Sequence, residues 1–342
     1  MAVDMLSGLL LEDAIVHNAI HKAQNTPDKT FFLGMLAGLW ITFGGLAGLS
    51  AAGGIPIDVR NNWPILPKLG LAFFFPTALH FIVLFGGELF TGNTMIVVIG
   101  WLNKKLTLKK MLLNWFIVYL GNFCGCVLFG YLFGYLTEIF EHEPYLSYVQ
   151  SIAVTKTHYS WGVIFLKGIV ANTCVCLGVI LGLASRDAAG KIIALWFPPV
   201  IFVLMGMEHV VANQFFVNIG LMYGAETTIG KMWYNQSAAA LGNLVGGAIV
   251  LGLSEHVMNH WKSPLPWHKD HPRGSLAAHD VESTRRAKET PSQISSSANS
   301  IMNMFTGHHG PKIEVTPDAE KDNITLRPPT ATHHFNGTAQ MV

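Results

Sequence analysis

Two polar patches hold the side chains that could do chemistry, and each lies in the middle of a long apolar run. Residues 86–93 read GGELFTGN, and residues 206–213 read GMEHVVAN. Two of their differences bear on chemistry, because the second patch carries His209 and the first carries Thr91. An imidazole exchanges protons near neutral pH, since its ordinary pKa is about 6.5. A threonine hydroxyl donates a hydrogen bond to an oxygen without adding a competing negative charge.

Such a pair suits a pathway for the anion of a weak acid that takes up a proton on the way. A bare anion loses much of its hydration free energy in an apolar constriction, whereas its protonated form enters far more easily. We therefore expect His209 to link transport to protons and Thr91 to hold an oxygen of the passing acid. Bulky apolar side chains would form narrow hydrophobic gates around this polar centre, and the candidates are Phe75, Leu79, Leu89, Phe90 and Phe202.

Other polar residues of the two patches are copies of each other. Gly, Glu and Asn recur at an offset of 120 residues, and the motif LGNFCG at 120–125 returns as LGNLVG at 241–246. A helix break inside lipid leaves backbone N–H and C=O groups unpaired, so it survives only when protein or a wet cavity covers it. A carboxylate present in both copies is expected to brace these freed N–H groups. The predicted helix-break scaffold consists of Glu88, Gly92, Asn93, Glu208 and Asn213.

The elements that must position the patches are transmembrane helices. A spanning helix needs about 20 mainly apolar residues. Each patch lies in a run that is too long for one span and too short for two, so we expect an interrupted helix there. Two sets of three spans enter the membrane in opposite senses, because three is odd. The predicted fold is an all-α membrane protein of six transmembrane helices in two inverted three-helix repeats, with the second and fifth discontinuous: 31–53, 66–101, 111–137, 161–184, 192–222 and 233–254.

The composition indicates a chain whose main solvent is lipid. Hydrophobic residues make up 51% of its 342 residues, charged residues make up 13%, and the formal net charge is +1. A soluble domain carries about 25% charged residues, so an ordinary soluble enzyme and a strongly basic nucleic-acid binder are excluded. We expect a cytosolic amphipathic helix in residues 1–28, a six-span domain in 29–255 and a disordered cytosolic tail in 256–342.

Basic residues near the spans predict the orientation, because they favour the cytoplasmic side. One side carries eight of them and the other carries four. Both termini are therefore expected in the cytoplasm, with the protein in the plasma membrane. The larger set is Lys22, Lys29, Lys104, Lys105, Lys109, Lys110, Arg186 and Lys191, and the smaller set is Arg60, Lys68, Lys156 and Lys231.

The chain resembles the formate/nitrite transporter family over about residues 10–255, through the motifs ELFTGN (88–93), YLGNFCG (119–125), ANTCVCL (171–177), EHVVAN (208–213) and GNLVGG (242–247). The resemblance implies an aquaporin-like fold, a homopentamer, and transport of formate, nitrite or similar anions with protons across the lipid bilayer. At matching positions it implies that Lys156 draws in the anion and favours its protonation. It also implies that Asn172 faces the central site beside Thr91 and His209.

The sequence predicts no enzymatic activity, cofactor, metal ligand or nucleic-acid partner, and three other functions are alternatives to transport of anions. An aquaporin proper would show Asn-Pro-Ala at both breaks, whereas no proline follows Asn93 or Asn213. A receptor or scaffold would act through the C-terminal tail. A membrane enzyme is disfavoured because no paired nucleophile or metal-ligand spacing accompanies His209 in the spans. Formate, nitrite, acetate, lactate and hydrosulfide are all compatible with the pattern.

Overall fold

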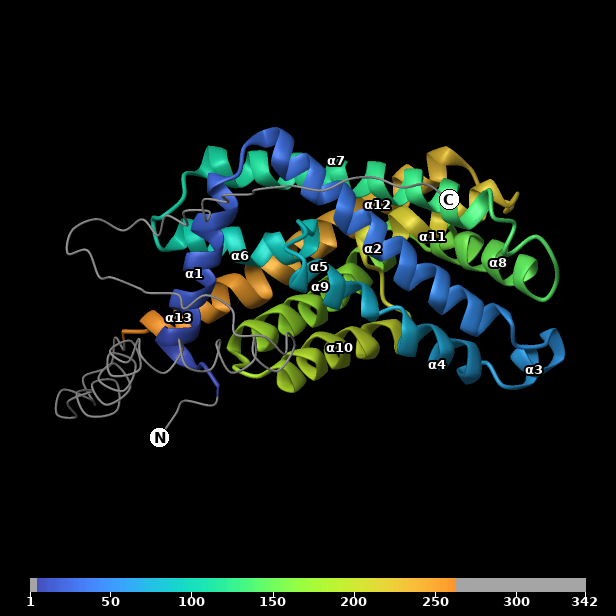
Figure 1. Cartoon of the computed structure of the whole chain (residues 1–342), viewed down its shortest axis with the longest axis horizontal. Helices are drawn as coiled ribbons and strands as arrows, with labels where there is room; N and C mark the ends of the chain where they lie inside the picture. Colours follow the sequence, from blue (N-terminus) through green and yellow to red (C-terminus); the bar gives the residue numbers. More distant parts are fainter. Residues whose placement is uncertain (1–4, 263–342) are drawn as a thin grey trace, which may run out of the picture. The chain divides into compact units, whose positions relative to one another are not determined.

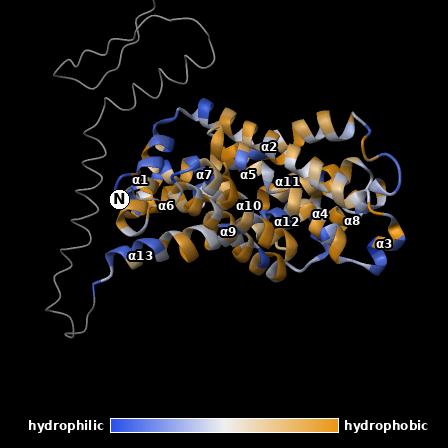
Figure 2. Cartoon of the chain, turned by 60° about the horizontal axis from the view of Figure 1, so that its bottom comes forward, coloured by the Kyte–Doolittle hydropathy of each residue, from blue (hydrophilic) through white to orange (hydrophobic). Residues whose placement is uncertain are grey.

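The computed structural model describes residues 5–262, and helices account for nearly all of them. Five helical stretches within these residues are long and apolar enough to cross a membrane. They are Pro27–Gly53 (α2), Ile65–Leu84 (α4, Ile65–Phe74, followed by α5, Thr77–Leu84), Leu108–Tyr135 (α7, Leu108–Gly130, with the π-helical η1, Tyr131–Tyr135), Trp161–Ala184 (α9), and Ile229–His260 (α12, Ile229–Leu244, the π-helical η2, Val245–Leu253, and α13, Ser254–His260). Figure 2 shows apolar residues along the long helices, while α1, α3 and α13 carry hydrophilic ones.

Three shorter apolar helices lie inside this bundle or against it, and they are α6 (Phe90–Leu102), α10 (Ala188–Leu204) and α11 (Val210–Met222). Every residue of α6 is buried as far as Gly100. The first eleven residues of α11 are also buried, except the half-buried Asn218. Because α6 contacts α1, α7, α9 and η2, and α11 contacts α2, α7, α8 and α12, both short helices form the core of the bundle.

Two less apolar helices stand in matching places before long helices. Helix α1 (Gly8–Gln24) precedes α2 and packs on α6, and α8 (Tyr145–His158) precedes α9 and packs on α11. The short α3 (Ile57–Asn62) follows α2. Figure 1 shows α1 and α13 at one end of the bundle, with α3 and α8 at the opposite end. The N-terminal helix predicted from the sequence is α1, and α2 begins at Pro27, two residues before the predicted boundary at 29.

Both long apolar runs contain a helix, five non-helical residues and a second helix. The first gap is 85–89 and the second is 205–209. Gly86 and Gly206 have φ of +74° and +69°, in the left-handed region that glycine adopts without steric cost. The next residue in each gap donates its N–H back into the preceding helix, from Gly87 to the carbonyl of Ile82 at 2.7 Å and from Met207 to that of Phe202 at 3.0 Å. Glycine therefore ends each helix with a Schellman turn.

The prolines of the two runs act differently. Pro76 separates α4 from α5, whereas Pro198 and Pro199 lie within the continuous α10. The sequence places a proline early in both runs, and only the first run breaks there. A proline removes one backbone donor and crowds the preceding turn, and α10 accommodates this because both its prolines are buried against neighbouring helices.

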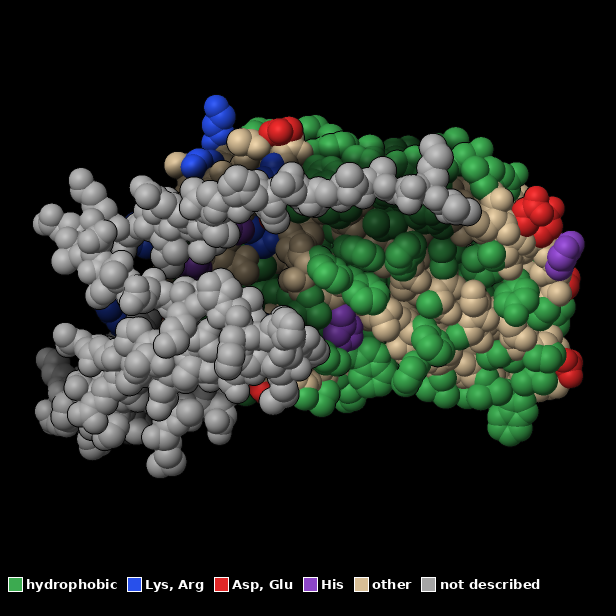
Figure 3. Space-filling model, viewed as in Figure 1, with side chains coloured by type: hydrophobic (Ala, Val, Ile, Leu, Met, Phe, Trp, Pro, Cys, Tyr) green, Lys and Arg blue, Asp and Glu red, His purple; other side chains and the backbone are tan. Residues whose placement is uncertain are grey.

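Close approach of backbones holds the long helices together. Helix α2 packs on α7, and α9 packs on α12. A Cβ added to Gly38 of α2 would lie 2.6 Å from the backbone nitrogen of Cys126 of α7, and one on Gly125 would collide with the carbonyl of Met35. Small residues at such crossings let helix backbones pack tightly. This packing matters in lipid, where the hydrophobic effect does not drive helices to associate. Figure 3 shows hydrophobic side chains over the middle of one face of the bundle.

The predicted C-terminal tail lies mostly outside the described residues. Helix α13 extends to His260, five residues past the predicted end of the six-span domain at 255. Residues 263–342 are not described, so the expectation for the tail concerns residues outside those described.

Candidate functional site

The interrupted helices direct two helix N-termini at one point. Leu89 is the N-cap of α6 and His209 is the N-cap of α11, and both side chains line the same small cavity. A helix N-terminus carries roughly half a positive charge from its unpaired N–H groups. This chain buries few charged side chains, so two helix N-termini at one place favour an electronegative group at that place.

His209 and Thr91 meet at the centre of the bundle. The Nε2 atom of His209 lies 2.9 Å from Oγ1 of Thr91, and these side chains are 2% and 0% exposed. The N–H of Ala212 donates to Nδ1 of His209 at 3.0 Å. Because Nδ1 accepts that bond, the ring proton is on Nε2, so Nε2–H donates to the Thr91 oxygen. The Thr91 hydroxyl hydrogen then stays available for another acceptor.

Asn172 supports this centre from α9. Its Nδ2 donates to the carbonyl of Thr91 at 3.2 Å, to Oγ1 of Thr94 at 2.9 Å and to the carbonyl of Asn243 at 2.6 Å. Thr94 in turn donates to the Thr91 carbonyl at 2.6 Å. Asn172 thus holds the backbone of Thr91 and is not among the residues that line the central cavity.

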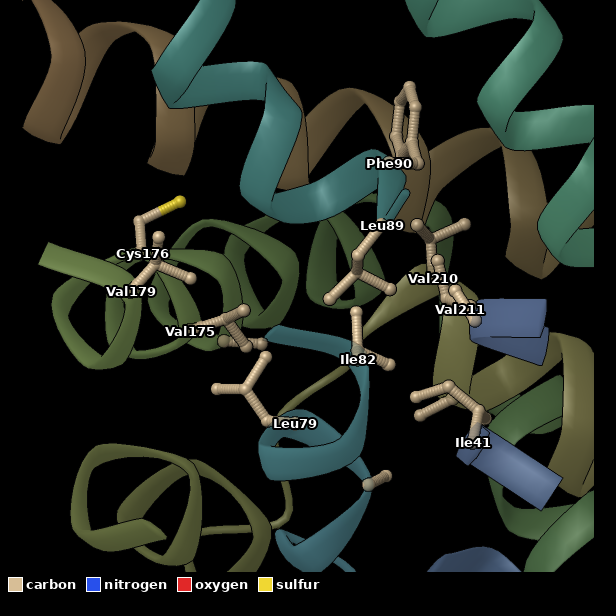
Figure 4. Close-up of a cluster of buried hydrophobic side chains, with 14 of the residues drawn as sticks. Ile41, Leu79, Ile82, Leu89, Phe90, Val175, Cys176, Val179, Val210 and Val211 are labelled. Atoms are coloured by element: carbon tan, nitrogen blue, oxygen red, sulfur yellow. The ribbon is translucent and has the colours of Figure 1, made fainter. Parts of the chain in front are cut away.

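Four of the five predicted gate residues surround the central cavity, which has a volume of about 20 Å³. That space holds about one water molecule, so the passage is narrow here. The ring of Phe202 stacks on that of His209 with centroids 5.6 Å apart. The fifth residue, Phe90, does not line this cavity, and its ring packs on Tyr119. Figure 4 shows Leu79 and Leu89 directed towards the same space and Phe90 directed away from it. The four lining residues are Phe75, Leu79, Leu89 and Phe202.

Two larger cavities flank the small one. The first, of about 370 Å³, shares Phe75, Phe202 and His209 with the central cavity. The second, of about 290 Å³, shares Leu79 and Leu89 with it. We call them the first and second vestibules. The two vestibules are therefore separated from each other by the apolar side chains around His209.

Both vestibules contain more lysines than carboxylates. The first is lined by Lys68, Lys156 and Lys167 together with Glu208. The second is lined by Lys22 and Lys29 together with Glu88, and it also has His21. A cleft with one sign of charge and apolar walls raises the local concentration of ions of the opposite sign. Both vestibules therefore attract anions.

Lys156 takes part in a network on the first vestibule. Its Nζ lies 3.3 Å from Oε1 of Glu208, whose carboxylate is 2% exposed. Asn213 of α11 donates to Oε2 of Glu208 at 2.6 Å and to Oδ1 of Asn235 at 2.9 Å. The buried carboxylate is thus paired and hydrogen-bonded, as a charge at this depth must be.

The same network is repeated on the second vestibule. Nζ of Lys22 lies 3.1 Å from Oε2 of Glu88. Asn93 donates to the same carboxylate and, at 3.0 Å, to Oδ1 of Asn114. The predicted scaffold residues Glu88, Asn93, Glu208 and Asn213 thus lie in two equivalent clusters, while Gly92 lines the second vestibule.

Two asparagines cap the starts of the short helices. Oδ1 of Asn122 accepts from the N–H of Phe90 at 2.9 Å, and Oδ1 of Asn243 accepts from that of Val210 at 2.8 Å. Asn122 also donates to the carbonyl of Glu88 at 2.8 Å, and Asn243 makes the matching bond in the second break at 3.0 Å. These side chains, rather than the glutamates, satisfy the freed backbone groups at the breaks.

Sequence reasoning did not single out Lys22, Asn114 or Asn235. One signal for Lys22 was present, because Lys22 and Lys156 each stand five residues before the first residue of the following long helix. A signal for the two asparagines was present as well, because Asn114 and Asn235 recur at the offset of 121 residues that also separates LGNFCG at 120–125 from LGNLVG at 241–246.

Comparisons with known proteins agree with this arrangement. The family profile described as formate/nitrite transporter matches residues 11–257. The uncharacterized transporter YrhG of Bacillus subtilis is 34% identical over 252 residues, which cover 74% of this chain and 93% of that protein. Formate-nitrite transporter 3 of Toxoplasma gondii is 33% identical over 242 residues, which cover 70% of this chain. The match spans about half the length of that relative, 48%.

Solved structures have the same fold. A chain described as a pentameric formate channel with formate bound aligns with a TM-score of 0.59 and 25% identity, over 68% of this chain and 97% of its own length. A family profile that matches most of the chain, together with these relatives, identifies an integral membrane protein of a transporter and channel family, in which no enzymatic activity is implied. The chain belongs to the formate/nitrite transporter family.

Proposed function

We propose that this protein carries small monovalent anions of weak acids, formate and nitrite among them, across a membrane together with a proton. The observation that carries the proposal is the buried contact of 2.9 Å between Nε2 of His209 and Oγ1 of Thr91. It lies between two vestibules that attract anions. Membership of the formate/nitrite transporter family supports anions of this kind as substrates.

Lys156 performs the first step on its side of the membrane. Its ammonium group lines the first vestibule and draws the anion in. Beyond Lys156 the apolar passage favours transfer of a proton from water onto the anion, because the neutral acid enters an apolar region at a far smaller cost in free energy than the anion does. Lys22 stands in the equivalent position in the second vestibule and performs the same step for passage in the other direction.

The centre then holds the neutral acid by hydrogen bonds. His209 donates to Thr91, and the Thr91 hydroxyl donates onward to an oxygen of the substrate. Asn172 keeps Thr91 in position through its backbone carbonyl. Because both central groups act as donors, an oxygen-bearing acid or anion is favoured there over an apolar solute. This donor pair is where we expect transport to be linked to protons.

The apolar residues around the centre act as gates. Phe75 and Phe202 separate the first vestibule from the central cavity, and Leu79 and Leu89 separate it from the second. A hydrophobic constriction stops a hydrated ion and lets a neutral molecule through after small side-chain rotations. Phe90 packs on Tyr119, so we assign it to holding α6 in place.

We further propose six transmembrane spans in two inverted three-helix repeats, similar to aquaporins. The order α1, α2, α4–α5, α6, α7 is matched by α8, α9, α10, α11, α12, with the second and fifth spans interrupted. The likeness to a solved chain described as a pentameric formate channel supports a homopentamer. The excess of basic residues on one side supports cytoplasmic termini, with the protein in the plasma membrane.

Uptake of labelled formate and nitrite into proteoliposomes tests the proposal. External pH is varied from about 8 to about 5, the range in which an imidazole exchanges protons. We expect uptake by the wild type to rise as pH falls, because more of the anion is protonated in the vestibule. His209→Asn keeps a hydrogen-bond donor but does not exchange protons, so we expect it to reduce uptake and to leave only the part of the pH dependence that protonation of the anion in the vestibule supplies.

His80→Asn serves as the matched control, since His80 bonds the carbonyls of Pro76 and Ile192 and lines none of the three cavities. Its pH profile should match that of the wild type. Uptake that ignores pH in the wild type, or that is unchanged in His209→Asn, would contradict the proposed mechanism.

A further inference from the structure

Three side chains far apart in the sequence meet where α1 contacts α13. Glu12 lies on α1, and His256 and His260 lie one helical turn apart on α13. One possible ligand atom from each lies within 4.8 Å of the others. Figure 1 shows these two helices side by side at the end of the bundle. This cluster is away from the three cavities and is not used in the proposed transport.

The carboxylate of Glu12 is buried, with 2% of the side chain exposed, and is only half satisfied. Its Oε1 accepts from Nδ2 of Asn103 at 2.7 Å and lies 2.7 Å from Nδ1 of His256. Its Oε2 lies 3.1 Å from Nε2 of His260. Those two atoms are not aligned as a hydrogen bond, so Oε2 has no hydrogen-bond partner among the described residues. A buried polar atom left unpaired costs free energy and calls for an explanation.

The surroundings of Glu12 agree with a role as a ligand. Both histidines of α13 lie beside its two oxygens, and Asn103 donates to Oε1, so the carboxylate and the imidazoles form one set of donor atoms. A carboxylate must be ionised and an imidazole neutral to bind a metal.

We propose that Glu12, His256 and His260 form a binding site for a divalent transition-metal ion, with Zn²⁺ as the best fit. Two histidines at positions i and i+4 of a helix present both rings on one face. Zn²⁺ accepts imidazole nitrogen and carboxylate oxygen at about 2.0–2.2 Å, and many sites have three protein ligands and one open position. The N···O separations of 2.7 and 3.1 Å would widen to about 3.4 Å around an ion with tetrahedral bonds of 2.0–2.2 Å, which is a small movement of the exposed side of the cluster.

Access and surroundings suit an ion that exchanges with solution. His260 is 47% exposed, whereas Glu12 is 2% exposed, so the ion would enter past His260 and reach a buried carboxylate. Asn103, at the C-terminal end of α6, donates to Glu12 and fixes its orientation. A hydrogen-bonded carboxylate of this kind is the usual support for a metal ligand.

Occupancy of the site would join α1 to α13. Helix α1 also carries Lys22, which pairs with Glu88 at the second vestibule. A metal ion would therefore fix the helix that bears one of the lysines of the second vestibule. The binding itself is independent of transport, and so is the test below.

The test uses the purified full-length chain in detergent, stripped of metal with a chelator. Co²⁺ is added and followed by its visible absorption, and thermal unfolding is measured with and without Zn²⁺. We expect one tight equivalent and a rise of several degrees in the unfolding temperature for the wild type, since a ligand that binds only the folded state stabilises it. Glu12→Gln and His260→Ala should each lose that equivalent and the rise.

His17→Ala is the matched control, because His17 is an exposed histidine on the same helix outside the cluster. It should behave as the wild type. Seven further histidines lie in residues 263–342, and any metal they bind is common to all variants, so the decisive quantity is the difference from the control. Glu12 is buried and its variant could misfold, whereas His260 is half-exposed and its variant should fold. Equal binding by His260→Ala and His17→Ala would overturn the proposal.

Discussion

At the residue scale, His209 caps a helix and contacts Thr91 at the same time. Its Nδ1 accepts the Ala212 N–H, as an N-cap side chain does. Protonation of Nδ1 would break that bond and leave a buried N–H facing another N–H. In the resting site the cap therefore favours the neutral imidazole with its proton on Nε2, directed at Thr91. Leu89 occupies the position in the first break that His209 occupies in the second, and it has no imidazole. Only one half of the molecule therefore supplies that group.

Thr91→Val tests the hydroxyl with almost no change in shape. The substitution removes the acceptor of His209 and the donor to the substrate. An unpaired buried donor costs about 1–3 kcal/mol, which corresponds to about fivefold to 160-fold in rate. We expect formate uptake into proteoliposomes to fall by that factor, with the fold retained. Thr42→Val is the control, since Thr42 is equally buried but bonds only the carbonyl of Gly38 in its own helix. Equal uptake by the two variants would refute the role of Thr91.

At the element scale, the site exists because two helices stop in the middle of the bundle and restart. Glycine in the left-handed region ends each first helix, and an asparagine from α7 or α12 caps each second helix. The backbone groups that a break exposes are thereby satisfied inside the protein. The glutamates of the breaks are instead held by lysine and asparagine side chains at the vestibules.

Asn243→Ala tests the cap at the second break. The substitution removes three bonds, to Val210 N–H and to the carbonyls of Gly168 and Glu208. Each buried group left unpaired costs about 1–3 kcal/mol, so we expect a lower midpoint of thermal unfolding in detergent and a lower yield. Asn218→Ala is the control, because Asn218 is half-buried and bonds only the carbonyl of Gln214 in its own helix. A midpoint like that of the control would contradict the capping role.

Gly125→Ala tests the contact between α2 and α7. The added methyl group collides with the carbonyl of Met35, a backbone atom that cannot rotate away. Overpacking of this kind costs about 1–3 kcal/mol, and we expect the unfolding midpoint to fall. In Gly162→Ala the new methyl group meets nothing within 4 Å, so its midpoint should equal that of the wild type. The prediction fails if the two variants unfold alike.

The sequence predicted the breaks because their cause is local. Glycine and a polar patch inside an apolar run, at 86–93 and again at 206–213, led to the expectation of breaks there, and the non-helical residues are 85–89 and 205–209. The sequence also predicted that Thr91 and His209 lie close together, since the repeat brings the two breaks to one place. It did not predict that α10 continues through Pro198 and Pro199, because buried packing against neighbouring helices decides that.

The parts of the site that sequence did not predict depend on contacts between elements. Lys22 reaches Glu88 only because α1 folds back onto α6. Phe90 was expected as a gate, and its side chain packs on Tyr119 because its backbone is turned by the cap from Asn122. Neither periodicity nor composition contains such information, since both describe one element at a time.

At the scale of the whole molecule, the protein is a bundle whose outer surface suits lipid or other copies of itself. Five apolar stretches are long enough to cross a membrane, and large hydrophobic side chains are exposed along them, among them Phe116 of α7 and Trp233 of α12. The described residues of one chain contain both vestibules and the centre, so each copy in an assembly would carry its own pathway.

Native mass spectrometry of the detergent-purified protein tests the assembly. We expect a particle of about five times the chain mass of 37.5 kDa, as in the pentameric solved neighbour. Masses are compared after mild detergent removal and again after denaturation, which serves as the control for the single chain. A dominant monomer or dimer under the mild conditions would show that the proposed homopentamer is wrong.

The matched ion pairs, Lys22 with Glu88 and Lys156 with Glu208, have a consequence for the direction of flow. A protein that attracted anions on only one face of the membrane would carry them preferentially in one direction. Here each of the two described vestibules carries a lysine–glutamate pair and an excess of lysine, so both faces attract anions. We expect the gradients of the acid and of protons to set the direction, and a cell could use one such protein to take in a nutrient or to discharge a waste product.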